Sequence, residues 1–105
     1  QADLEDGTLF PLAGRQFDVV LVVNYLWRPI LADVIATVAL GGWLIYETFA
    51  VGNEAHGRPS NPNFLLKPNE LLEAVLPGFE IHEFHHGLTD GPAVKQWIVG
   101  RRVSP

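Results

Sequence analysis

Residues 17–23 read Phe17-Asp18-Val19-Val20-Leu21-Val22-Val23, and this aliphatic, β-branched run decides the fold. A strand with one face in water alternates apolar and polar side chains, whereas this run stays apolar after Asp18. Such a run is typical of a strand covered on both faces, as in a parallel sheet packed between helices. We therefore predict a strand over Phe17–Val23 inside an α/β sheet.

Downstream of this run the sequence predicts a helix and then a second strand. Pro29 opens the helix, because proline is tolerated at the first helical position. Apolar residues at positions 30, 31, 34, 35 and 38 form a stripe that would face the sheet. Gly41-Gly42 is predicted to end the helix in the left-handed conformation, and Trp43–Phe49 to form the second strand. A strand, helix and strand in this order form a right-handed, parallel crossover.

The second half of the chain predicts a long connection, a short helix and a hairpin. Residues 51–67 are rich in Gly, Asn and Pro, and a connection of this length is usually functional or mobile. A helix is predicted over Pro68–Leu76, with strands over Phe79–His86 and Val94–Val103 pairing as an antiparallel hairpin. We thus expect one α/β domain over residues 1–105, with a mostly parallel sheet and one reversed strand.

The strand at Phe17–Val23 lacks a predicted neighbour on one side. An apolar strand of this kind at an exposed sheet edge is prone to aggregate. The sequence also contains no methionine, so we expect it to be part of a longer translation product. Either an absent N-terminal half or a second copy is expected to pair with this edge, a two-fold dimer being the commonest closed arrangement.

The composition excludes several classes of protein. Seven Lys and Arg against twelve Asp and Glu give a net charge of −5, which disfavours a nucleic-acid partner. The chain has no cysteine, so disulfide scaffolds and thiolate chemistry are excluded. The longest uncharged apolar stretch, Val34–Tyr46, is shorter than the roughly 20 residues of a membrane span. We expect a cytoplasmic protein with no membrane association.

Three stretches in a fixed order carry a family resemblance. They are Ala2-Asp3-Leu4-Glu5, then residues 17–29 with Asn24-Tyr25-Leu26-Trp27-Arg28-Pro29, and then Leu40–Phe49 with its glycine pair. Together they resemble the C-terminal half of a class I S-adenosylmethionine-dependent methyltransferase, of the general kind that includes tellurite-resistance-type enzymes. The resemblance implies a partial Rossmann-like sheet whose N-terminal strands are absent from this sequence.

The resemblance also implies an incomplete cofactor site. Asp3 and Leu4 would contact the adenine of S-adenosylmethionine, and Asn24 and Tyr25 would lie beside its methionine end. The family's glycine-rich loop, which lets backbone amides approach the cofactor, would precede Gln1 and is absent from these residues. The chain alone is therefore expected to bind the cofactor weakly and to turn over nothing.

Substrate-pocket candidates lie where the strands end. Because ligands bind beyond the carboxyl ends of strands in open α/β sheets, side chains following two such strands should line one crevice. The candidates are Trp27, Arg28, Glu47, Thr48, Phe49 and, in the long connection, Arg58. Catalytic residues are not assigned.

Each candidate has two interpretations. Arg28 would clamp a carboxylate or oxyanion, or would be solvated while Tyr25 and Trp27 pack on the helix. Glu47 would be a base or, somewhat more favoured, a structural partner of Arg58, because a carboxylate ending an apolar strand is costly unless it is paired. Arg58 would close over the substrate.

The three histidines near the C-terminal hairpin do not predict a metal site. On a regular strand His82 and His86 share one face and His85 points to the other, which lacks the convergence that zinc requires. We expect methylation of an unknown small molecule by the parent protein. The alternative is a non-catalytic assembly module that pairs through the Phe17–Val23 edge.

Overall fold

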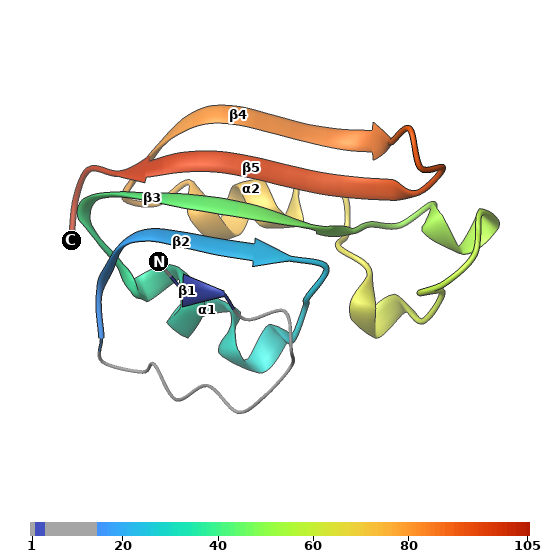
Figure 1. Ribbon diagram of the computed structural model, residues 1–105, viewed down its shortest axis with the longest axis horizontal. Helices are drawn as coiled ribbons and strands as arrows, with labels where there is room; N and C mark the ends of the chain where they lie inside the picture. The colour runs from blue at the N-terminus through green and yellow to red at the C-terminus, as the bar shows by residue number, and fades with distance from the viewer. Residues whose placement is uncertain (1, 4–14) are drawn as a thin grey trace.

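The computed structural model describes residues 2–3 and 15–105, which form one mixed sheet in the order β1-β2-β3-β5-β4 (Figure 1). The strands are β1 (Ala2–Asp3), β2 (Phe17–Val23), β3 (Val38–Phe49), β4 (Phe79–Leu88) and β5 (Val94–Arg102). The β1–β2 and β2–β3 pairs are parallel, whereas β5 pairs antiparallel with both β3 and β4. The predicted strand at 17–23 and the C-terminal antiparallel hairpin are confirmed.

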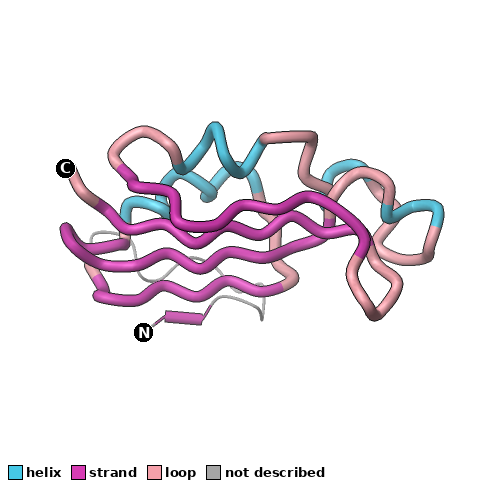
Figure 2. The backbone as a smooth tube through the Cα atoms, turned by 90° about the horizontal axis from the view of Figure 1, so that it is seen from above, coloured by secondary structure: helices cyan, strands magenta, loops and turns pink. Residues whose placement is uncertain are grey.

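Helices α1 (Arg28–Ala36) and α2 (Glu70–Val75) lie on the same side of the sheet (Figure 2). Alternate strand residues point toward them, because successive side chains on a strand face opposite ways. The resulting core consists mainly of Val20, Val22, Leu44, Tyr46 and Ile98 from the strands, with Leu31, Val34, Leu71 and Val75 from the helices. The other side of the sheet carries neither of these helices.

The glycine pair lies inside a strand and does not end the helix, which corrects the prediction. Helix α1 ends at Ala36 with Thr37 as its C-cap, and β3 begins at Val38. The β2–β3 register shifts between Phe17 and Val19 at this place. A Cβ on Gly42 would lie 2.8 Å from the carbonyl oxygen of Asp18, so the pair permits a close backbone approach.

A short strand borders β2, contrary to the expectation that nothing preceding β2 flanks it. Ala2 pairs with Val20 and Asp3 pairs with Leu21, both in the parallel sense. This contact spans two of the seven residues of β2. The pairing with β1 therefore covers only part of the outer edge of β2.

The long connection has local structure. It contains two 3₁₀ turns, Asn53–Ala55 and Pro62–Phe64, and a β-bridge joins Ala50 to Leu66. The Asn53 side chain is buried, donates to the Pro59 carbonyl at 3.0 Å and accepts from the Val94 amide at 2.9 Å. One buried amide thus joins the first part of the connection to the start of β5.

Candidate functional site

The side chain of Lys95 contacts polar side chains at the carboxyl ends of β2 and β3. The Lys95 ammonium donates to the Asn24 side-chain oxygen at 2.7 Å and lies 3.7 Å from a Glu47 carboxylate oxygen. It also lies 4.9 Å from the centre of the Phe49 ring. We call Asn24, Glu47, Phe49 and Lys95 the Lys95 cluster. It contains three of the predicted site residues and one that the sequence analysis missed.

The backbone holds Asn24 at this position. Its φ of 57° is left-handed, a conformation that asparagine tolerates better than most residues. The Asn24 amide donates to the Glu47 carbonyl at 2.8 Å, so the chain leaving β2 is bound to β3. The expected pairing of Glu47 with Arg58 is wrong, since Glu47 pairs with Lys95 and Arg58 is exposed.

Arg28 forms an internal clamp between the two helices. Its guanidinium makes two hydrogen bonds to the Glu70 carboxylate, at 2.7 and 2.8 Å. It also donates to the carbonyls of Leu65 at 2.7 Å and Asn63 at 3.0 Å. Donating to the Glu70 carboxylate raises the pKa of Arg28, and accepting from Arg28 lowers the pKa of Glu70. Arg28 is therefore bound to partners within the chain, in contrast to the interpretation of a solvated side chain.

The remaining candidates from these strands point in different directions. Thr48 is buried on the side that carries the helices, whereas Glu47 and Phe49 lie on the opposite side. Trp27 is 50% exposed. Tyr25 packs against the core, and its carbonyl accepts from the Tyr46 hydroxyl at 2.8 Å. Burial raises the pKa of Tyr46 well above its ordinary value.

A buried glutamine joins β5 to the start of α2. Gln96 is fully buried, its oxygen accepts from the Leu71 amide at 3.1 Å, and its nitrogen donates to the Lys67 carbonyl at 2.7 Å. The same nitrogen lies 2.9 Å from Nδ1 of His86. Sequence analysis missed Gln96, which lies on the same buried face of β5 as Ile98 and is the polar residue on that face.

The histidine faces differ from the prediction. His82 contacts Trp43 edge-on at 4.8 Å and His85 stacks on Trp97 at 4.3 Å, so both lie opposite the helices. His86 points to the helix side, toward Gln96. The reason is a register irregularity between Ile81 and Glu83, which reverses the alternation beyond it. Within residues 15–105, no three His, Asp or Glu side chains are grouped to hold a metal ion.

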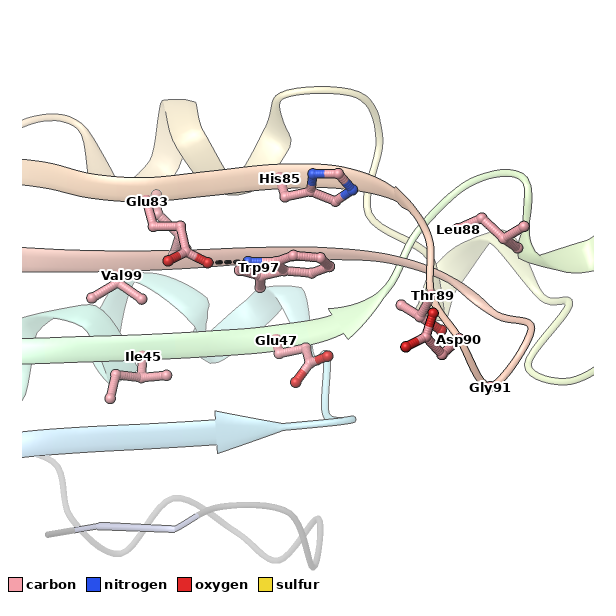
Figure 3. Close-up of a pocket in the computed structure, with 11 residues that line it drawn as sticks. Ile45, Glu47, Glu83, His85, Leu88, Thr89, Asp90, Gly91, Trp97 and Val99 are labelled. Carbon is pink, nitrogen blue, oxygen red and sulfur yellow. Dashed lines mark hydrogen bonds between the residues drawn. The ribbon is translucent and has the colours of Figure 1, made fainter.

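A depression of about 790 Å³ lies on the side of the sheet opposite the helices (Figure 3). Its floor includes Ile45, Trp97 and Val99, and the turn at 89–91 borders one end. The Trp97 indole nitrogen donates to Glu83 at 2.6 Å. Glu47 belongs both to this depression and to the Lys95 cluster, so the two features are continuous.

The two residues predicted to contact adenine, Asp3 and Leu4, have no described side chains. The backbone of Asp3 is in β1, next to Leu21 of β2. Leu4 lies outside the described residues.

Of the helices that the structure describes, neither α1 nor α2 has the length or apolar character of a membrane span.

Two solved structures share this architecture. TehB from Haemophilus influenzae matches over 90% of this chain with a TM-score of 0.60 and 14% identity. A S-adenosylmethionine-dependent methyltransferase from Methanosarcina mazei matches over 92% with the same TM-score and identity. The chain has a methyltransferase-like fold. It spans 40% of the first protein's chain and 64% of the second's. No protein-family model and no curated protein matches the sequence.

Proposed function

We propose that the chain is part of an S-adenosylmethionine-dependent methyltransferase that acts on a small molecule. The observation that carries this proposal is the methyltransferase-like fold, found over nine-tenths of the chain in two structures. In this interpretation the sheet is a partial Rossmann-like sheet, and the rest of the cofactor site comes from a further, N-terminal part of the protein.

The Lys95 cluster has the donors and acceptors that the cofactor's methionine end requires. That end carries an ammonium and a carboxylate. Glu47 presents a carboxylate, Lys95 an ammonium, and Asn24 an amide that can donate and accept. These groups lie at the carboxyl ends of β2 and β3, where ligands of open α/β sheets bind. Tyr25 follows Asn24 and would border the same end.

When bound, S-adenosylmethionine supplies an electrophilic methyl group. What the chain's residues contribute is position, because transfer to an acceptor depends mainly on holding the two groups in line. Trp27 and Phe49 would provide apolar walls, whereas Glu47 is paired with Lys95 and would face the cofactor's ammonium. Arg58, exposed in the long connection, would close over the substrate. Its replacement by alanine in the parent protein should weaken substrate binding and leave cofactor affinity unchanged.

Cofactor titration of the 105-residue chain tests this proposal. With an isotope-labelled chain followed by NMR, S-adenosylmethionine should shift the amides of residues 24, 47 and 95. Lys95→Met should weaken binding, whereas Arg101→Met, a matched loss of one exposed cation on the same strand, should not. No shift at these residues at saturating cofactor would contradict the assignment, and methylation by this chain alone would contradict its expected inactivity.

A second candidate is an assembly module, and the exposed edge of β2 favours it. Among the described residues, only Ala2 and Asp3 pair with this edge, at Val20 and Leu21. A second copy or the N-terminal half would extend the sheet there. Sedimentation analysis separates the candidates: a stable dimer that proline at Val19 abolishes supports the module, whereas a monomer that binds cofactor supports the methyltransferase part.

A further inference from the structure

His86 and Gln96 join the two ends of the long connection. This connection leaves β3, carries the exposed Arg58 and returns to α2 (Figure 1). At its start, Nε2 of His86 lies 3.3 Å from the Val51 carbonyl oxygen. At its end, the Gln96 nitrogen donates to the Lys67 carbonyl at 2.7 Å. Nδ1 of His86 and the Gln96 nitrogen are 2.9 Å apart, so one network runs from Val51 to Lys67.

Two backbone groups fix the orientation of the Gln96 amide. The Leu71 amide can only donate, and it lies 3.1 Å from one end of the Gln96 side chain, so that end is the oxygen. The Lys67 carbonyl can only accept, so the end beside it is the nitrogen. Gln96 is fully buried, so water does not replace either partner. The nitrogen carries a second hydrogen, which is left for His86.

These constraints assign the proton of His86. Because an N–H group of Gln96 faces Nδ1, this ring nitrogen accepts and carries no hydrogen. A neutral imidazole then has its hydrogen on Nε2, from which it donates to the Val51 carbonyl. The network is thus complete only when His86 is neutral and in this one tautomer.

Protonation of His86 would place two donors against each other. An imidazolium carries a hydrogen on both ring nitrogens, so Nδ1–H would face the N–H of Gln96. Turning the amide over does not remove the conflict, because its nitrogen would then face the Leu71 amide and its oxygen the Lys67 carbonyl. Either arrangement leaves buried polar groups without partners, which costs free energy.

The carboxylates on the elements packed against His86 are bound elsewhere or exposed. Glu70 is bonded to Arg28, Glu54 accepts from the Gly52 amide, and Glu73 is exposed. The other titratable residues of these elements and of β4 nearby are His56, Arg58 and Lys67 in the connection, and His85, Asp90 and Lys95 on the opposite side of the sheet. Among the ion pairs of residues 15–105, none includes His86. A proton on His86 therefore gains no opposite charge in exchange for the lost hydrogen bond.

We propose that His86 is a pH-sensitive anchor of the long connection, which holds the connection when its imidazole is neutral and releases it when protonated. Imidazole changes its charge between about pH 5 and about pH 8. Because the anchored form binds one proton fewer than the released form, anchoring is favoured at the upper end of this range and weakened at the lower end. Release would loosen Val51 and Lys67, and with them the segment that carries Arg58.

Amide hydrogen exchange followed by NMR tests the anchor in the 105-residue chain. The protection factor, the intrinsic rate divided by the observed rate, removes the pH dependence of the exchange chemistry. The Leu71 amide reports on the network through its bond to Gln96, and the Val51 amide through its bond to the Leu66 carbonyl. From about pH 8 to about pH 5, both protection factors should fall about tenfold, whereas that of Tyr46 in β3 should change less than about twofold.

Two histidine replacements provide matched variants. His86→Gln keeps an acceptor and a donor but cannot become charged, so the protection of Leu71 should no longer depend on pH. His82→Gln removes an exposed histidine of the same strand that lies on the opposite side of the sheet and pairs with Glu80; it should keep the wild-type pH dependence. Neither cofactor nor methyl acceptor is present, so the result is independent of the proposed methyl transfer.

Four outcomes would overturn the proposal. Two come from the wild-type chain: protection of Leu71 that is equal at both pH values, and a fall that is equally large at Tyr46, which would mean loss of global stability. The third is an unchanged pH dependence in His86→Gln, which would assign it to another group. The fourth needs no variant: proton–nitrogen correlation spectra of the histidine rings at about pH 8 that place the His86 hydrogen on Nδ1.

Discussion

Replacing Arg28 with alanine tests the clamp between the two helices most directly. The guanidinium makes two bonds to Glu70 and donates to the carbonyls of Leu65 and Asn63, all between 2.7 and 3.0 Å. These bonds join the first residue of α1 to the first residue of α2 and to the end of the long connection. Their loss is expected to destabilise the whole domain.

The size of the effect follows from exposure. The side chains are 32% exposed for Arg28 and 22% for Glu70, so water partly screens the pair, and we assign it about 1 kcal/mol, the upper end for surface pairs. The two bonds to carbonyls add about 0.5–1 kcal/mol each, since those carbonyls regain water in the variant. The total is about 2–3 kcal/mol, or a fall in Tm on the order of 10–15 °C for a domain of this size.

Urea denaturation followed by circular dichroism at pH 7 measures this free energy. Arg58→Ala, which removes an exposed arginine with no ion pair among the described residues, is the control and should change stability by less than about 0.5 kcal/mol. A double-mutant cycle with Glu70→Gln should give a coupling of about 1 kcal/mol. If Arg28→Ala behaves like the control, the clamp reasoning fails and Arg28 is available to hold a substrate anion.

Further predictions concern pH, a buried amide and a close backbone approach. Because the pKa of Glu70 is lowered in the folded state, its stabilisation is present above its ordinary value of 4.5 and lost as pH falls through the folded pKa; urea titrations between pH 3 and 7 should show this arm, flattened in Arg28→Ala. Because burial raises the pKa of Tyr46, its stabilisation is present below its ordinary value of 10.0 and lost as pH rises above it; Tyr46→Phe should remove that alkaline arm, and an unchanged arm would refute it. Gln96→Leu leaves a buried amide and a carbonyl without their partner and should cost about 2–3 kcal/mol in thermal or urea unfolding; a neutral result would mean that the segment rearranges. Gly42→Ala places a Cβ 2.8 Å from a carbonyl oxygen and should cost about 2 kcal/mol, whereas Gly91→Ala, with open space around it, should be neutral; equal melting temperatures would contradict the close approach.

Local patterns predicted the elements whose signals are continuous in the sequence. The uninterrupted apolar run at 17–23 predicted β2 with its bounds, although among the described residues helices cover only one of its two faces. The turn-forming residues before Val94 predicted the hairpin. Gly41-Gly42 misled, because a glycine pair serves a helix end and a close strand approach equally well.

Features that depend on register or on distant residues could not be predicted. One irregularity between Ile81 and Glu83 moved His85 onto the face of His82, since a one-residue slip reverses every later side chain. Asn24 and Lys95 are 71 positions apart, so only the paired strands bring them together. The candidate site was therefore half predictable: the strand ends were identified, and the lysine that joins them was not.

Because β5 lies between β3 and β4, the sheet cannot be completed during synthesis until β5 has been made. This strand is the last in the sequence, yet it lies between β3 and β4 (Figure 1). Among the described residues, β4 has no other strand beside it. While residues 94–102 are still within the ribosome, β3 exposes an unpaired edge and β4 has nowhere to bind. The nascent chain thus keeps its sheet open until β5 emerges, and β5 then fills both gaps in one step.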